Sequence, residues 1–181
     1  MFQDLKAEGL VQGYVVEAFP WTSEPPLKAL RAGYTEGIID GFIFYLNPLQ
    51  RFASNPLWEE IVQKNRPVIA MRTVSGGAVH DLRNVPGYAW KDYLQKRAVE
   101  VAPIFEKSGV KSWTEFCVRF AHSLPQVKAT VGSTSKIENL DEFLSASTNP
   151  EPLPESIVRE INILQSRWSD ELDILAEPWT M

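Results

Sequence analysis

The sequence predicts an α/β protein in which about four parallel strands alternate with helices. Two features predict this class: short apolar runs typical of buried strands, and longer stretches with helical periodicity between them. Their alternation implies parallel strands that are joined by right-handed crossovers. A closed (β/α)8 barrel needs eight such units and typically about 250 residues. The 181 residues hold four units, which allows an open sheet whose edges need cover.

The first two units occupy the N-terminal third of the chain. Apolar residues 10–18 predict a strand, and the proline pair after Ser23 suits the first turn of a helix that ends near Gly33. Residues 38–46 are almost continuously apolar, which indicates a strand covered on both faces. Asn55 precedes a proline and is expected to cap the next helix.

The third unit begins with a buried strand at residues 67–73. A loop with three glycines follows at residues 75–88, and loops of this length are usually functional or mobile. Residues 90–107 then predict an amphipathic helix that is broken or bent at Pro103. Ser112 opens a further helix as part of a capping box.

The fourth unit is the most informative stretch. A strand at residues 127–131 leads through a Gly-Ser-Thr-Ser turn into a helix, and Ser135 with Glu138 forms a second capping box. The helix is therefore expected to start near Lys136 and to run to residue 146. Free N–H groups and the positive end of the helix dipole make such a turn a ready anion site. An ordinary strand-to-helix turn with a good N-cap is the alternative.

The chain is expected to form a single domain over residues 1–181. A proline-rich connector at residues 149–154 precedes a last amphipathic helix at residues 155–175. Its apolar side contains Ile157, Ile161, Leu164, Trp168 and Leu172.

Composition excludes several functional classes. A net charge of −5 without a Lys/Arg run argues against a nucleic-acid partner. No apolar run approaches a membrane span, and the first residues lack the apolar region of a signal peptide. The only cysteine is Cys117, which rules out an internal disulfide and a cysteine-rich metal site. We therefore expect a soluble, cytoplasmic protein.

Four segments resemble the C-terminal half of the aldo-keto reductase family, in the family's order and spacing. Residues 6–19 read KAEGLVQGYVVEAF and residues 38–51 read IIDGFIFYLNPLQR. Residues 66–77 read RPVIAMRTVSGG. Residues 113–143 read WTEFCVRFAHSLPQVKATVGSTSKIENLDEF. Together the resemblance covers residues 4–147.

The resemblance implies half of a TIM (β/α)8 barrel and an oxidoreductase that binds NADP(H). The family's catalytic Tyr, Lys, Asp and His come from the first four strand–helix units, which have no counterpart in this chain. Neither His80 nor His122 matches the family's histidine. No catalytic residue and no metal ligand is therefore predicted, and the chain alone is expected to be inactive. Carbonyl reduction would need the complementary N-terminal half.

The half that is present is the one that binds the cofactor in the family. Its phosphate-side segments follow the strands at residues 67–73 and 127–131. Glu142 matches the family's adenine-side glutamate, and Phe143 either stacks on adenine or packs in the core. The predicted cofactor-binding residues are Arg72, Thr73, Ser75, Gly76, Gly132, Ser133, Thr134, Ser135, Lys136 and Glu142.

The nicotinamide side departs from the family. Glu17 and Ala18 replace a Ser-Asn pair, Ile43 replaces a glutamine, and Met71 replaces the tyrosine that stacks under the nicotinamide. Glu17 is expected to face solvent or to pair with Arg72. These changes favour the alternative that the chain is a non-catalytic remnant, which acts as a nucleotide- or anion-binding module or as an interaction module.

A half barrel would leave two strand edges without partners, at residues 11–18 and 127–131. The inward faces of its strands would also lack an opposite wall, and several strand residues are too apolar to meet water: Ile39, Phe42, Phe44, Val68 and Ile69. We therefore expect a homodimer, a complex with a complementary N-terminal half-barrel, or poor solubility.

Overall fold

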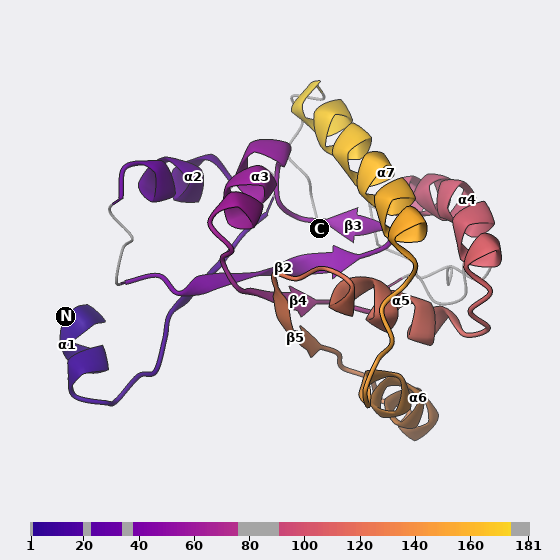
Figure 1. The fold of residues 1–181 in the computed structure, drawn as a ribbon, viewed down its shortest axis with the longest axis horizontal. Helices are drawn as coiled ribbons and strands as arrows, with labels where there is room; N and C mark the ends of the chain where they lie inside the picture. Colours follow the sequence, from indigo (N-terminus) through magenta and orange to yellow (C-terminus); the bar gives the residue numbers. More distant parts are fainter. Residues whose placement is uncertain (1, 20–22, 34–37, 76–90, 175–181) are drawn as a thin grey trace.

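The computed structural model of the protein describes residues 2–19, 23–33, 38–75 and 91–174. Its centre is a parallel sheet with the strand order β1-β2-β4-β5 (Figure 1). The strands are β1 (Val15–Glu17), β2 (Gly41–Asn47), β4 (Val68–Met71) and β5 (Val127–Val131). This order confirms the predicted α/β fold, and it makes β1 and β5 the two edges of the parallel sheet, as the sequence predicted.

Helices follow the strands as expected. They are α2 (Glu24–Arg31), α3 (Asn55–Gln63), α4 (Lys91–Ser108), α5 (Trp113–His122), α6 (Ile137–Ser147) and α7 (Glu155–Ile174). The sequence predicted a helix broken or bent at Pro103, and α4 passes through Pro103 without a break. Proline removes the hydrogen bond to the carbonyl of Val99, and Val99 lies on the exposed side of the helix. Within the described ranges, no helix is long and apolar enough to cross a membrane.

Two short elements were not predicted. Helix α1 (Phe2–Ala7) lies at the N-terminus, and β3 (Gln50–Arg51) folds back antiparallel onto the end of β2. The side chain of Asn47 makes this reversal, because its Oδ1 accepts a hydrogen bond from Leu49 N–H (2.9 Å). The sheet is therefore parallel except for this two-residue hairpin.

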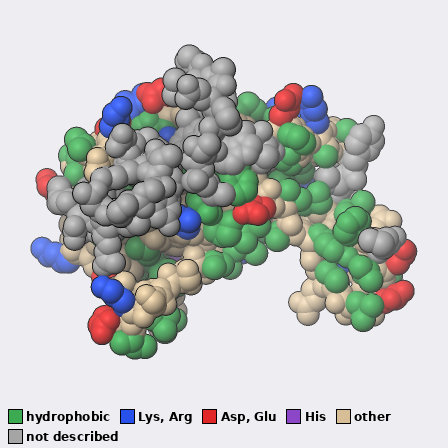
Figure 2. All heavy atoms as spheres, turned by 180° about the vertical axis from the view of Figure 1, so that it is seen from behind, with side chains coloured by type: hydrophobic (Ala, Val, Ile, Leu, Met, Phe, Trp, Pro, Cys, Tyr) green, Lys and Arg blue, Asp and Glu red, His purple; other side chains and the backbone are tan. Residues whose placement is uncertain are grey.

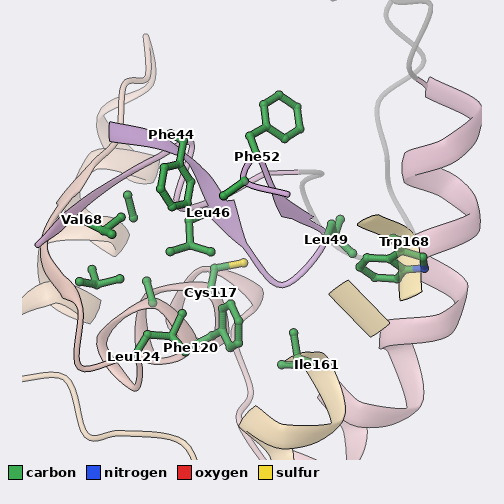
Figure 3. Packing of buried hydrophobic residues seen from close by; sticks show 14 of the residues in the cluster. Phe44, Leu46, Leu49, Phe52, Val68, Cys117, Phe120, Leu124, Ile161 and Trp168 are labelled. Atoms are coloured by element: carbon green, nitrogen blue, oxygen red, sulfur yellow. The ribbon is translucent and has the colours of Figure 1, made fainter. Parts of the chain in front are cut away.

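The core lies between one face of the sheet and the helices. Phe44, Leu46 and Val68 point from the sheet toward Cys117 and Phe120 of α5 (Figure 3), and all five are 0% exposed. Alternate residues of β2 are buried on this face, as the period of a strand requires. Burial of large side chains here is the main stabilising term of the fold.

The other face of the sheet is less covered. Ile43, Tyr45, Ile69 and Met71 on β2 and β4 are half-buried. The sequence did not separate the two faces: the expectation that Phe42, Phe44 and Val68 would lack cover is wrong, because their side chains are fully buried.

The first turn of α3 also differs from the prediction, because Asn55 does not cap the helix. Ser54 is the N-cap residue, so Asn55 is the first residue of the helix and not its cap. The amide of Asn55 instead reaches α7, where its Nδ2 donates hydrogen bonds to Ser166 O (3.0 Å) and Asp170 Oδ1 (2.7 Å). Asn55 thus links two outer helices that are more than a hundred residues apart in the sequence.

Asp40 ties the N-terminal helix to the start of β2. Its carboxylate accepts hydrogen bonds from Lys6 Nζ (2.8 Å) and from Tyr14 N–H (2.7 Å). The bond from Lys6, and next the bond from Tyr14, hold the pKa of Asp40 below its usual value. This contact joins α1 to the β1 edge of the sheet.

Acid is expected to release this contact. Because the folded-state pKa of Asp40 is lowered, its stabilisation is fully present above the ordinary Asp pKa of about 3.9 and is lost as the pH falls through the folded-state value. The pH titration of the Tyr14 amide chemical shift should therefore have a midpoint below about 3.9, and Asp40→Asn should abolish it. Glu8→Gln, which removes an exposed carboxylate nearby, is the control and should keep the wild-type titration. A midpoint at or above the ordinary value would contradict the prediction.

Candidate functional site

The two segments that the sequence predicted as phosphate-side meet at one edge of the sheet. Strands β4 and β5 are parallel neighbours, and their last residues, Met71 and Val131, are register partners. The segments that follow, residues 72–75 and 132–136, therefore leave from adjacent carboxyl ends. Ligands of parallel α/β folds bind at this end of the strands.

Residues 72–75 form a tightly held turn. Arg72 is exposed and adopts a left-handed backbone with φ 46°, which is uncommon for a residue other than glycine. Thr73 is fully buried and its Oγ1 donates a hydrogen bond to Ala70 O (3.0 Å). Ser75 is buried too, and its carbonyl accepts a hydrogen bond from Trp113 Nε1 (3.0 Å). Among these residues Arg72 presents its side chain to solvent, and Gly76 lies outside the described residues.

Residues 132–136 form an exposed turn before α6. The predicted capping box is wrong: α6 begins at Ile137, Lys136 is its N-cap residue, and no side chain caps it. Just before the helix, the hydroxyl of Thr134 accepts a hydrogen bond from Lys136 N–H (3.1 Å). The first bond of the helix runs from Leu140 N–H to Lys136 O (3.2 Å), so the N–H groups of residues 137–139 have no partner within the helix.

Gly132 and Phe143 are in contact across this turn. A Cβ on Gly132 would lie 3.3 Å from Phe143 Cζ, so the ring packs against the glycine. Phe143 is half-buried. Of the two predicted roles for Phe143, packing is the one that this contact supports.

Glu142 lies on α6 but is engaged by α5. Its carboxylate accepts hydrogen bonds from Ser112 Oγ and from Thr114 Oγ1 (2.9 Å). Ser112 also caps α5, because its Oγ accepts a hydrogen bond from Glu115 N–H (3.2 Å), as the first capping box predicted. A carboxylate beside a helix N-terminus is stabilised by the helix dipole. Glu142 therefore joins the two helices.

The residues at the predicted nicotinamide positions also lie together. Glu17 is the register partner of Ile43, and Met71 is that of Tyr45, across three neighbouring strands. Glu17 is exposed, whereas Ile43 and Met71 are half-buried. Ala18 is 0% exposed.

Two residues whose side chains often take part in catalysis, Cys117 and His122, lie outside the candidate site. Cys117 is fully buried, and burial raises the pKa of its thiol well above the usual value, so it is unreactive. His122 is half-buried on α5, and desolvation lowers its pKa. No group of three His, Cys, Asp or Glu residues in the described part of the chain is placed to hold a metal ion.

Four parallel strands that alternate with helices correspond to part of a (β/α)8 barrel. Two solved structures share this fold across 90% of the chain: the aldo-keto reductase AKR11C1 from Bacillus halodurans, in its apo form (TM-score 0.64) and in its holo form (TM-score 0.61). Each is 18% identical to this chain, which spans 54% and 53% of them, about half of their length. The sequence matches no family model and no curated protein. The likeness confirms the predicted fold, a partial barrel of the aldo-keto reductase type.

Proposed function

We propose that the chain is the NADP(H)-binding half of an aldo-keto reductase-like oxidoreductase. One observation carries the proposal: the two segments that resemble the family's phosphate-side segments leave from the adjacent ends of β4 and β5. Carbonyl reduction would take place when a complementary N-terminal half supplies the catalytic Tyr, Lys, Asp and His. We place this oxidoreductase in the reducing cytoplasm, where Cys117 stays a thiol.

The residues fit the two ends of such a cofactor unequally. At the phosphate end, Arg72 and Lys136 are exposed cations, and the first turn of α6 offers N–H groups. At the other end, Ala18 and Ile43 have no hydrogen-bonding group in their side chains and Met71 has only a weak acceptor, so none of the three can replace the family's polar contacts to a carboxamide. When bound, the cofactor would supply a hydride. The chain's own residues support the binding of its phosphate groups.

This imbalance favours a second candidate function from another class. The chain would then be a non-catalytic module that keeps a nucleotide or anion site and has lost the nicotinamide site. The specific observation is the apolar character of Ile43 and Met71, at the positions of the family's glutamine and stacking tyrosine.

Ligand titration with tryptophan fluorescence tests the phosphate site. 2′,5′-ADP is expected to bind, and Lys136→Ala should weaken its binding about tenfold because a charge-assisted contact is lost. Lys128→Ala is the matched control, since Lys128 is also exposed but lies near the opposite end of β5. Equal losses in both variants, or no response to 2′,5′-ADP, would contradict a phosphate site.

Nicotinamide mononucleotide and aldehydes separate the two candidate functions. Both predict no oxidation of NADPH by the 181-residue chain alone, with any aldehyde. A response to nicotinamide mononucleotide supports the oxidoreductase half, and a response to 2′,5′-ADP alone supports the binding module. Turnover by the isolated chain would contradict both.

The partner that we propose for either function closes the open barrel, and it is a second copy of the chain or a complementary half.

A further inference from the structure

The backbone of Arg72 is fixed by a side chain from the neighbouring strand. Asn47, at the end of β2, is fully buried, and its Nδ2 donates a hydrogen bond to Arg72 O (3.0 Å). Asn47 is itself held in place, because its backbone carbonyl accepts a hydrogen bond from Gln165 Nε2 of α7 (2.8 Å). The unfavourable left-handed conformation of Arg72 is thus held by groups in the core.

The side chain of Arg72 is fixed as well. Its guanidinium lies over the ring of Tyr45, 4.6 Å from the ring centre. Tyr45 stacks on Phe52, with 4.6 Å between ring centres and 25° between the ring planes, and Phe52 is only 3% exposed. A row of contacts therefore runs from the buried Phe52 through Tyr45 to the exposed Arg72.

Restraining the side chain of an exposed arginine costs conformational entropy when the protein folds. The same restraint lowers the entropy that is lost when a ligand binds. We propose that Tyr45 and Asn47 are positioning residues that hold the Arg72 guanidinium ready for a phosphate group of a nucleotide. This inference rests on the proposed function. Neither residue is among the cofactor-binding residues that the sequence predicted.

A double-mutant cycle with 2′,5′-ADP tests the role of Tyr45. Tyr45→Leu is expected to weaken binding about tenfold, and Tyr45→Phe, which keeps the ring, should bind like the wild type. In an Arg72→Ala background, Tyr45→Leu should have no further effect, because the guanidinium that Tyr45 holds is absent. Wild-type affinity in Tyr45→Leu, or the same loss in both backgrounds, would overturn the inference.

The ligand-free protein gives a second readout that separates this inference from the proposed function. In nitrogen relaxation measurements the Arg72 side-chain Nε–H group should be as rigid as the backbone in the wild type and in Tyr45→Phe, and mobile in Tyr45→Leu. A mobile group in the wild type would overturn the positioning role, whatever binds. If 2′,5′-ADP and pyrophosphate both fail to bind while Arg72 is rigid, the phosphate site fails and the restraint of Arg72 stands as structural only, which also overturns the inference.

Discussion

Replacing Gly41 with alanine is expected to lower the free energy of unfolding by about 3 kcal/mol or more. Gly41 begins β2, and a Cβ on it would lie 2.4 Å from the carbonyl oxygen of Pro67. That oxygen accepts the hydrogen bond from Phe42 N–H (2.9 Å), which joins β2 to the start of β4. The obstacle is backbone, so no side-chain rotation relieves the clash, and the two central strands must move apart.

Thermal unfolding measures the effect. For a chain of this size, about 2–4 °C of melting temperature corresponds to 1 kcal/mol, so Gly41→Ala should melt at least about 6 °C below the wild type. Gly109→Asn is the matched control: Gly109 has φ 72° and open space around it, and asparagine tolerates this conformation. The control should change stability by less than about 1 kcal/mol. A Gly41→Ala protein with the melting temperature of the wild type would contradict this prediction. It would show that the start of β4 leaves room for a Cβ at position 41.

The fold could be predicted from the sequence because its main elements are locally encoded. The apolar run of β2 identifies a buried strand, the β-branched run of β5 identifies a strand at the sheet edge, and Ser112 caps α5 as its pattern indicates. Helix α1 and strand β3 could not be predicted in this way. They are short, and they are held by distant groups such as Asp40 and by the Asn47 turn.

The candidate site was predictable in its location and not in its contacts. The predicted parallel strands carry both phosphate-side segments at their carboxyl ends, and the pairing of β4 with β5 places those two ends side by side. The bonds from Ser112 and Thr114 to Glu142 depend on how α5 packs against α6, and that packing has no local signal. The contact of Arg72 with Tyr45 likewise depends on register between two strands.

Exposed apolar side chains are concentrated on the two edge strands and on the elements next to them in the sequence. The described part of the chain exposes ten large apolar side chains, and seven of them lie on β1, on β5, or on the segments that directly precede β1 or follow β5 in the sequence. Figure 2 shows hydrophobic side chains over α1, which precedes β1, and over α6, which follows β5. The seven are Phe2, Leu10 and Val15 near β1, and Val131, Ile137, Leu140 and Leu144 near β5. We expect both edges to take part in an interface.

Both edges can be covered by one kind of contact. In a two-fold dimer about the barrel axis, β5 of each copy would lie beside β1 of the other, so the unpaired N–H and C=O groups of both edges would be satisfied together. Four strands from each copy would give the eight of a closed barrel. A complementary half-barrel would cover the same two edges. Full burial of a large apolar side chain is worth about 1.5–3 kcal/mol, so several of them outweigh the cost of association.

We therefore expect the purified chain to be a dimer at micromolar concentration, or to be poorly soluble, and not to be a stable monomer of 20.5 kDa. Ile137→Glu should reduce association or precipitation, because it places a charge on the exposed apolar surface that follows β5, and an acidic residue in the first turn of α6 suits the helix dipole. Ile163→Glu is the matched control: Ile163 is 62% exposed and Ile137 is 61% exposed, but Ile163 lies on α7, away from both edges. Sedimentation equilibrium distinguishes the outcomes. A monomeric wild type with cooperative unfolding would show that the chain covers its own edges, and an equal effect of both substitutions would show that association does not use the edge.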